Sequence, residues 1–376
     1  MSGIVGFFNV KEKIMNSQEI LMNMNNKLMH RGSDKDGYYI GDNIALGFRT
    51  ILCGDNQPIS FNFEGNTYVI VYDGNIYNLK ELKLELEQYD FCFSTNSDAE
   101  VILKGYIHFR ESFVNKLNGV FAFAIFDKNQ NSLFIARDHF GIKPFYYTII
   151  NNTFVFASEI KALFQFPNVN PKMDSMGICE LIGIGPAHTP GVTVFKDIYE
   201  IKPAHYGIYS DGGFHSKSYW KLISKPHTDS LGKTCETIKY LLEDSIKKQL
   251  VSDLPVCSFL SGGLDSSIIS LYAANYYKVN DLKPLDTYSV DYVDNDKNFV
   301  KSDFQPNSDN YYIELMSKRL YSEHHNIVLD TPELADALEA AMIARDVPGM
   351  ADIDSSLLLF CKNVKPEASI ALTGEC

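Results

Sequence analysis

The amino-acid sequence predicts two domains of different fold class: an α+β domain of stacked sheets with helices outside, and after it an α/β domain with a parallel sheet. The chain has 376 residues, whereas a single domain usually has ~100–200. Residues 121–126 form a continuous apolar run, which is typical of a strand covered on both faces. Beyond Trp220, short apolar strands alternate with helical segments, which is the pattern of a doubly wound parallel sheet.

Composition and charge exclude several classes of function. Hydrophobic residues make up 45% and charged residues 22%, as in ordinary globular proteins. The net charge is −13, and no cluster of Lys and Arg indicates a nucleic-acid surface. No apolar run approaches the ~18 residues of a membrane span, the N-terminus has no signal-peptide pattern, and the seven cysteines are scattered without a Cys-x-x-Cys pair. We therefore expect a cytoplasmic protein without nucleic-acid or membrane partners.

The first domain is predicted to contain paired strands and a few helices. Strands are expected at residues 4–8, 66–72, 120–126, 133–136, 145–150 and 154–157. Helices are expected at 17–30, after Asn78, and after Ser97, where Ser97-Asp98-Ala99-Glu100 has the spacing of a capping box. Because Asp73-Gly74 is a strong turn signal, we expect the strand at 66–72 to end there.

The second domain is predicted from its alternation of elements. Strands are expected at 256–260, 287–290, 326–329 and 368–373, with helices at 265–277, 310–321 and 332–344. The predicted domain boundaries are 1–210, a linker at 211–229, and 230–376. The last predicted strand ends three residues before the chain does, and nothing follows to cover it. The sequence therefore predicts that the second domain is truncated.

The sharpest motif is SGGLDSS at residues 261–267, between a predicted buried strand and a predicted helix. Two adjacent glycines let the backbone approach a ligand closely, and the N–H groups at a helix start bind phosphate. Asp265 would repel phosphate directly, so its expected task is to hold Mg²⁺ on a pyrophosphate. The motif lacks the Gly-Lys-Ser/Thr ending of a Walker A loop. Gly-Gly alone would indicate only a turn, but the seven residues together predict a pyrophosphate-binding loop.

The second candidate site is the N-terminus. A hydroxyl or thiol at residue 2, exposed when Met1 is removed, can act as a nucleophile with its own α-amino group as base. The α-amine titrates near pH 7.7–8.0, so it accepts a proton at neutral pH. Ser2 is small enough to permit removal of Met1. Since many proteins begin with Met-Ser, this pair alone indicates little.

Ordered segments throughout the chain resemble the glutamine-dependent asparagine synthetase family. The matching segments are GIVG at 3–6, HRGSD at 30–34, GNIYN at 74–78, SDAE at 97–100, RDHFGIKPFYY at 137–147, FASEIKAL at 156–163 and SGGLDSS at 261–267. The resemblance implies an N-terminal-nucleophile glutaminase domain with a four-layer αββα sandwich, followed by an ATP-pyrophosphatase domain of the adenine nucleotide alpha hydrolase-like class. It also implies ATP and Mg²⁺ as cofactors, glutamine (or ammonia) and aspartate as substrates, and it is compatible with a homodimer.

The site residues of the family carry over by position. Ser2 lies at the nucleophile position, and Asp73 and Gly74 lie at the oxyanion-hole pair. The glutamine-binding positions are Arg49 for the α-carboxylate, Asp98 for the α-ammonium, and Asn75. The ATP-binding positions are Ser261, Gly262, Gly263, Leu264, Asp265, Ser266, Ser267, Val290, Thr373 and Gly374, and Glu375 is the aspartate-binding position. Without the family, Asp98 would be a first-turn residue of a capped helix and Arg49 a surface charge.

Several departures from the family pattern bear on catalysis. Ser2 replaces a cysteine, and because a hydroxyl is far less acidic than a thiol of pKa ~8.5, the α-amine activates it poorly. Asp73 replaces an asparagine, and a carboxylate has no N–H to donate to an oxyanion. The loss of one such donor costs ~10²–10³ in rate. Asn75 replaces a usual glutamate and Ser33 a usual proline, and the acidic pair and lysine that follow Glu375 in the family lie outside these 376 residues.

The resemblance leads us to expect an asparagine synthase (glutamine-hydrolysing) homologue. Such an enzyme activates aspartate as β-aspartyl-AMP, releases pyrophosphate, and lets ammonia attack the acyl-adenylate. Two alternatives stay open. One is an adenylating enzyme similar to β-lactam synthetases or lasso-peptide cyclases, with an inactive glutaminase domain and an internal amine as the attacking group. The other is a non-enzymatic relative or a gene fragment, which the reading frame beyond Cys376 would distinguish.

Overall fold

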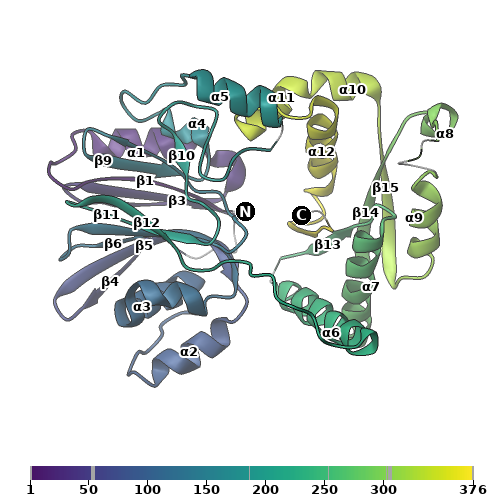
Figure 1. Cartoon of the computed structure of the whole chain (residues 1–376), viewed down its shortest axis with the longest axis horizontal. Coiled ribbons are helices and arrows are strands. Elements are labelled where there is room, and N and C mark those ends of the chain that lie inside the picture. The colour runs from purple at the N-terminus through teal and green to yellow at the C-terminus, as the bar shows by residue number, and fades with distance from the viewer. Residues whose placement is uncertain are drawn as a thin grey trace. The chain divides into compact units, whose positions relative to one another are not determined.

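The computed structural model describes residues 2–51, 56–185, 187–252, 254–301, 303 and 307–374. The chain divides into two compact units, Met1–Ser224 with two sheets and Lys225–Cys376 with one (Figure 1). Each unit has its own hydrophobic core. In the part of the chain that is described, no helix is both long and apolar enough to cross a membrane.

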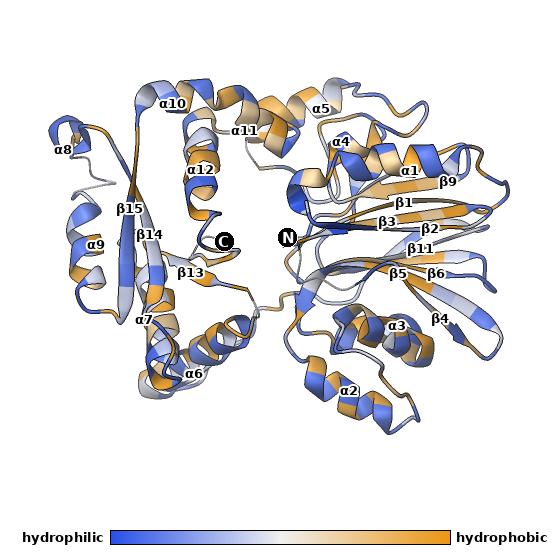
Figure 2. Ribbon diagram, turned by 180° about the vertical axis from the view of Figure 1, so that it is seen from behind, coloured by the Kyte–Doolittle hydropathy of each residue, from blue (hydrophilic) through white to orange (hydrophobic). Residues whose placement is uncertain are grey.

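Two antiparallel sheets build the N-terminal unit. Sheet A has the strand order β10 (Tyr199–Glu200), β8 (Tyr146–Ile150), β9 (Thr153–Ala157), β1 (Gly3–Asn9), β3 (Ile44–Thr50) and β2 (Lys35–Ile40). Sheet B has the order β12 (Gly213–Ser218), β11 (His205–Ser210), β7 (Ser132–Arg137), β6 (Gly119–Asp127), β5 (Asn66–Ile76) and β4 (Ile59–Phe63). The central strands are strongly hydrophobic (Figure 2). Five of the six predicted strands of this domain are confirmed nearly to their ends, while the sixth, at 66–72, extends further.

The two sheets stack face to face, and helices cover both outer faces. The core between the sheets contains Ile4 and Phe48 from sheet A and Val71 and Ala124 from sheet B, all buried. Outside sheet A lie α1 (Ser17–Asn26) and α4 (Ile160–Leu163), and outside sheet B lie α2 (Leu79–Glu87), α3 (Asp98–Phe109) and η2 (Arg110–Lys116). The short η1 (Met29–Arg31) follows α1 along the chain, and α5 (Ser175–Cys179) and the π-helix η3 (Glu180–Ile184) follow α4. Ser97 caps α3, because its hydroxyl accepts a hydrogen bond from the Glu100 N–H. The predicted four-layer αββα sandwich is confirmed.

The predicted turn at Asp73-Gly74 is wrong. Strand β5 runs straight through these residues to Ile76, and Gly74 pairs with Phe121 of β6. A Cβ atom on Gly74 would lie 2.3 Å from the Val120 carbonyl oxygen, so the glycine permits close approach of the neighbouring strand rather than a reversal of the chain. Pairing along the whole length of β6 therefore outweighs the local turn propensity.

The boundary of the first domain also differs from the prediction of 1–210 with a linker at 211–229. Residues 211–212 form the tight turn of a hairpin, and β12 pairs with β11 along its full length. The hairpin satisfies its backbone groups within sheet B, so residues 213–218 belong to the N-terminal unit. The compact units divide after Ser224.

The second unit contains a parallel sheet in the order β15 (Ser322–Leu329), β14 (Leu285–Tyr292), β13 (Val256–Phe259) and β16 (Ile370–Leu372). The helices are α6 (Leu231–Gln249), α7 (Leu264–Val279), α8 (Asn295–Asn298), α9 (Asn310–Ser317), α10 (Thr331–Asp336), α11 (Leu338–Arg345) and α12 (Ala351–Val364). One core cluster joins the sheet to α6, α7 and α9, and another joins its opposite face to α12. The predicted doubly wound sheet is confirmed, whereas α6, α8 and α12 were not predicted.

Candidate active sites

The first candidate site is formed where β1 begins. Ser2 precedes β1, and its hydroxyl lies 3.3 Å from the Thr50 hydroxyl at the end of β3. On β1, Ile4 and Phe8 point into the core between the sheets, and alternation along the strand gives Ser2 the same side. On β5 of sheet B, Val69 and Val71 point into this core as well. Alternation along β5 therefore directs the Asp73 side chain toward sheet A, on the side where Ser2 lies.

Arg31 links these two predicted site residues. Its Nε donates to the Ser2 carbonyl oxygen at 2.8 Å, and its Nη2 donates to Asp73 Oδ2 at 3.2 Å. The other Asp73 oxygen lies 3.1 Å from Lys143 Nζ. Asp73 is only 1% exposed, so its carboxylate needs such compensation, and two cations supply it. At the predicted oxyanion position, the chain therefore holds a buried, doubly paired carboxylate.

Glu159 completes this charged cluster. It accepts from Arg31 Nη1 at 3.1 Å and from His30 Nε2 at 2.9 Å, and it pairs with Lys161. Burial alone would raise the pKa of this carboxyl, but the hydrogen bonds from His30 and Lys161 hold the pKa at about 2. Glu159 thus fixes Arg31 between Ser2 and Asp73.

The expected role of Arg49 is contradicted by the strand register. Arg49 pairs with Gly3 and alternates with Phe48, which points into the core between the sheets, so the Arg49 side chain lies on the opposite, helix-covered face. There its Nε donates to the Asn25 carbonyl at 2.8 Å and its Nη2 to Asn26 Oδ1 at 2.6 Å. The guanidinium is engaged at the C-terminal end of α1, and the position beside Ser2 belongs to Thr50.

The other predicted glutamine-binding residues lie near the end of β5. Asp98, the first residue of α3, accepts through Oδ2 from the Tyr72 hydroxyl and from the Ile76 N–H, both at 2.8 Å. Burial and the neighbouring Asp98 charge raise the pKa of Tyr72 well above its ordinary value, so Tyr72 remains a donor. Asn75 is exposed on β5 beyond Asp73.

The second candidate site is the loop between β13 and α7. Gly262 has φ +80°, and a Cβ there would lie 2.9 Å from the Asp309 carbonyl oxygen, so this position demands glycine. The Ser261 and Ser266 hydroxyls lie 3.0 Å apart, and Ser266 also bonds the Gly263 carbonyl. Gly263 is the N-cap and offers no side chain, so no side chain caps the first turn of this 16-residue helix. Its backbone N–H groups and dipole suit an anion.

Among the other predicted nucleotide residues, Gly374 packs against this loop. β16 runs parallel to β13, and Gly374 follows it so closely that a Cβ would lie 2.9 Å from the Ser266 nitrogen and 3.0 Å from Asp265 Cβ. Thr373 is exposed beside it, and Val290 lies on β14, the strand next to β13. Leu264 is 76% exposed, and Asp265 is also exposed at the helix start. Glu375 lies outside the described residues.

Several residues of the first site were not predicted individually. They are Arg31, Thr50, Lys143 and Glu159. Arg31, Lys143 and Glu159 lie in segments 30–34, 137–147 and 156–163, which carry the family resemblance. That resemblance is the sequence signal that could have identified them. Thr50 could be placed only from the pairing of β1 with β3.

Family comparisons agree with this geometry. Residues 1–220 match the family described as Glutamine amidotransferase domain, and residues 237–376 match the family described as Asparagine synthase. The fold and the Ser2 site thus define a glutamine amidotransferase domain of the N-terminal-nucleophile class, followed by a synthetase domain.

Similar proteins extend the match over both domains. Asparagine synthetase (glutamine-hydrolyzing) 3 of Bacillus subtilis (strain 168) is 42% identical over 380 residues, covering 100% of this chain and 62% of the relative. Asparagine synthetase (glutamine-hydrolyzing) 1 of the same organism is 34% identical, covering 100% of this chain and 57% of the relative. Putative asparagine synthetase (glutamine-hydrolyzing) 2 of Methanocaldococcus jannaschii is 30% identical, with coverages of 89% and 67%. The chain belongs to the glutamine-hydrolysing asparagine synthetase family, and it spans 57–67% of the length of these relatives.

Replacement of Arg49 is expected to affect stability and not ligand binding. Arg49→Gln removes charge-assisted hydrogen bonds from a guanidinium that is 7% exposed and binds the last turn of α1. We expect the free energy of unfolding of the N-terminal unit to fall by about 1.5–3 kcal/mol, with glutamine affinity unchanged. Denaturant unfolding and calorimetric titration measure the two effects. A tenfold loss of glutamine affinity at unchanged stability would return Arg49 to the ligand site.

Acid is expected to unfold the N-terminal unit over a defined pH range. Hydrogen bonds overcome the effect of burial and hold the pKa values of Glu100, Glu159 and Glu200 at about 2 each. Because these values lie below the ~4.3 of an unfolded Glu, the stabilisation is complete above that pH and is lost as the pH falls toward 2. Unfolding midpoints measured from pH 7 to pH 2 should fall steeply below about pH 4.5.

A matched pair of variants tests whether the acid-dependent loss of stability arises from these glutamates. Glu100→Gln should flatten the acid-dependent fall, since Glu100 pairs with the buried Lys104 at 2.6 Å. Glu64→Gln, at an exposed position of the same unit, should leave the profile unchanged. A profile that Glu100→Gln leaves as steep as before would contradict the assignment.

Proposed function

We propose that the protein amidates aspartate at the expense of ATP. The carboxylate oxygen of aspartate attacks the α-phosphorus of ATP and pyrophosphate leaves; the ammonia nitrogen then attacks the acyl carbon of β-aspartyl-AMP and AMP leaves. The observation that carries this proposal is the loop at 261–267, with an uncapped helix start and with Gly374 packed against Ser266. The membership of the family and the names of the relatives support it.

Asp265 fits the role of holding Mg²⁺ on the pyrophosphate. Mg²⁺ in nucleotide sites typically binds one or two carboxylates together with substrate phosphates, and Asp265 is an exposed carboxylate in the first turn of α7. When bound, the ion would neutralise charge on the leaving pyrophosphate. Ser261 and Ser266 would donate hydroxyl hydrogen bonds to the same phosphates.

We further propose that free ammonia is a better nitrogen source for this protein than glutamine. Ser2 is a weaker nucleophile than a cysteine, and Asp73 offers no N–H to an oxyanion. The pairing of Asp73 with Arg31 and Lys143 supports this, because both cations are engaged by the Asp73 carboxylate at the oxyanion position. The N-terminal unit would bind glutamine and hydrolyse it slowly.

Exchange of labelled pyrophosphate into ATP tests the adenylation directly. We expect exchange that requires aspartate and Mg²⁺, and asparagine formation that is faster with ammonium than with glutamine. Exchange that requires another carboxylic acid would favour the second candidate function, an adenylating enzyme with a different acceptor. The observation that favours this candidate is the presence of Ser2 and Asp73, which impair the use of glutamine. Absence of exchange with aspartate would contradict the proposal.

A further inference from the structure

We propose that Lys35 anchors the carboxylate of the amino-acid ligand that lies beside Ser2. The inference rests on the proposed function, because it names a ligand-positioning residue of the same N-terminal site. It follows from the register of sheet A and from the charge pairing of the neighbouring cations.

The register places three side chains in one row. Thr50 pairs with Lys35 of β2 on one side, and its hydroxyl contacts Ser2 on the other. Opposed residues of antiparallel strands share a face. Tyr39 alternates in step with Lys35 along β2 and packs into the core between the sheets, so Lys35 lies on the face toward sheet B, as Ser2 does.

The dimensions of the row suit an amino-acid amide. Neighbouring strands lie ~4.8 Å apart, so the Lys35 backbone is about 10 Å from that of Ser2. An amide carbon and an α-carboxylate separated by four bonds lie about 5 Å apart. A lysine side chain, with four methylenes and an ammonium, spans the distance that is left between the ligand carboxylate and the Lys35 backbone.

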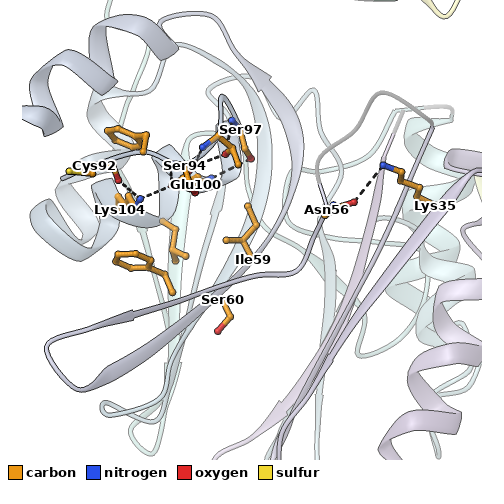
Figure 3. A pocket seen from close by; sticks show the side chains of 13 residues that line it. Lys35, Asn56, Ile59, Ser60, Cys92, Ser94, Ser97, Glu100 and Lys104 are labelled. Atoms are coloured by element: carbon orange, nitrogen blue, oxygen red, sulfur yellow. Dashed lines mark hydrogen bonds and ion pairs between the residues drawn. The ribbon is translucent and has the colours of Figure 1, made fainter.

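Lys35 also lines a cavity of about 660 Å³, whose lining residues include neither Ser2 nor Thr50, so the cavity lies on the Asn56 side of Lys35 and not at Ser2. Lys35 lies at one part of this cavity with Asn56, and the buried pair of Glu100 and Lys104 lies at another (Figure 3). The Lys35 Nζ is 3.5 Å from Asn56 Oδ1 and the side chain is exposed, so its ammonium can reach a ligand.

Charge pairing singles out Lys35 among the cations nearby. Lys104 is paired with Glu100 at 2.6 Å and bonds the Cys92 carbonyl. Arg31 and Lys143 are both engaged by Asp73, and Arg49 lies on the other face of the sheet. Across the described residues, Lys35 has no carboxylate partner. A carboxylate ligand beside Ser2 would therefore find its counter-charge at Lys35.

Calorimetric titration of the full chain with L-glutamine tests the proposal. Lys35→Gln should weaken binding about tenfold or more, since a charge-assisted hydrogen bond is lost, and Lys35→Arg should restore most of the affinity. Lys13→Gln, an exposed lysine of the same unit paired with Asp42, is the matched control and should change nothing. The probe 4-aminobutanamide, which is glutamine without its carboxylate, should bind the unmodified chain and Lys35→Gln equally.

Two results would overturn the inference, and they have different consequences for the proposed function. If the unmodified chain binds glutamine but Lys35→Gln binds it as well, or if Lys35→Gln weakens both ligands equally, Lys35 does not hold the carboxylate and the proposed function stands. If the unmodified chain does not bind glutamine, the glutamine site proposed for this unit is refuted together with the role of Lys35.

Discussion

The combined replacement Ser2→Cys and Asp73→Asn is expected to raise glutamine hydrolysis at least a hundredfold above that of the unmodified chain. The asparagine restores an N–H donor at the oxyanion position, and one such donor is worth ~10²–10³ in rate. The cysteine supplies a more acidic nucleophile to the α-amine. Glutamate release, measured at saturating glutamine and neutral pH, reports the gain.

The single variants separate the two effects. Ser2→Cys alone should gain less than the pair, because the carboxylate that Arg31 and Lys143 hold at Asp73 still opposes a developing oxyanion. Glu64→Gln makes the same acid-to-amide change at an exposed position and should have no effect. Turnover by the unmodified chain at the ~1 s⁻¹ or more of ordinary enzymes would show that Ser2 and Asp73 do not impair this site.

Gly262→Ala is expected to weaken Mg·ATP binding at least tenfold. At φ +80° an alanine is strained, and its Cβ would lie 2.9 Å from the Asp309 carbonyl, so the loop must move away from its present path. Binding to the full chain is measured by calorimetric titration. Affinity equal to that of the unmodified chain would show that the nucleotide does not use this loop.

Asp265→Ala should weaken ATP binding only when Mg²⁺ is present. Chelation of the metal should therefore remove the difference between this variant and the unmodified chain, because the carboxylate is assigned to the ion and not to the nucleotide. Glu236→Ala replaces an exposed acid on α6 of the same unit and should bind as the unmodified chain does. A loss that is independent of Mg²⁺ would contradict the role given to Asp265.

Much of the fold could be predicted because its signals are local. Continuous apolar runs identified strands such as β6, and the order of strand, Gly-Gly loop and helix predicted the loop at 261–267 in the place where the structure has it. Helix α6 was missed although Ile238, Leu242 and Ile246 recur at helical spacing, so the sequence did carry a signal for it.

The errors arose where pairing between distant segments decides the outcome. Asp73-Gly74 has the composition of a turn, but nine pairs with β6 keep β5 extended through it. Arg49 has the right chemistry to bind a carboxylate, but successive residues of β3 point to opposite faces of the sheet. Only the pairing of Arg49 with Gly3 shows on which face its side chain lies. The cluster of Arg31, Asp73 and Lys143 joins residues far apart in the sequence, and no spacing rule finds it.

The central claim is that residue 2 lies at the nucleophile position of a glutamine site in which serine and Asp73 impair the chemistry. A diazoketone analogue of glutamine, which alkylates a nucleophile positioned for the amide carbon, tests this claim through intact mass and peptide mapping. We predict slow or no labelling of the unmodified chain, and rapid labelling of the Ser2→Cys variant on the introduced thiol alone, which excess glutamine suppresses. Failure of Ser2→Cys to label, or labelling at another cysteine such as the exposed Cys92, would contradict the claim.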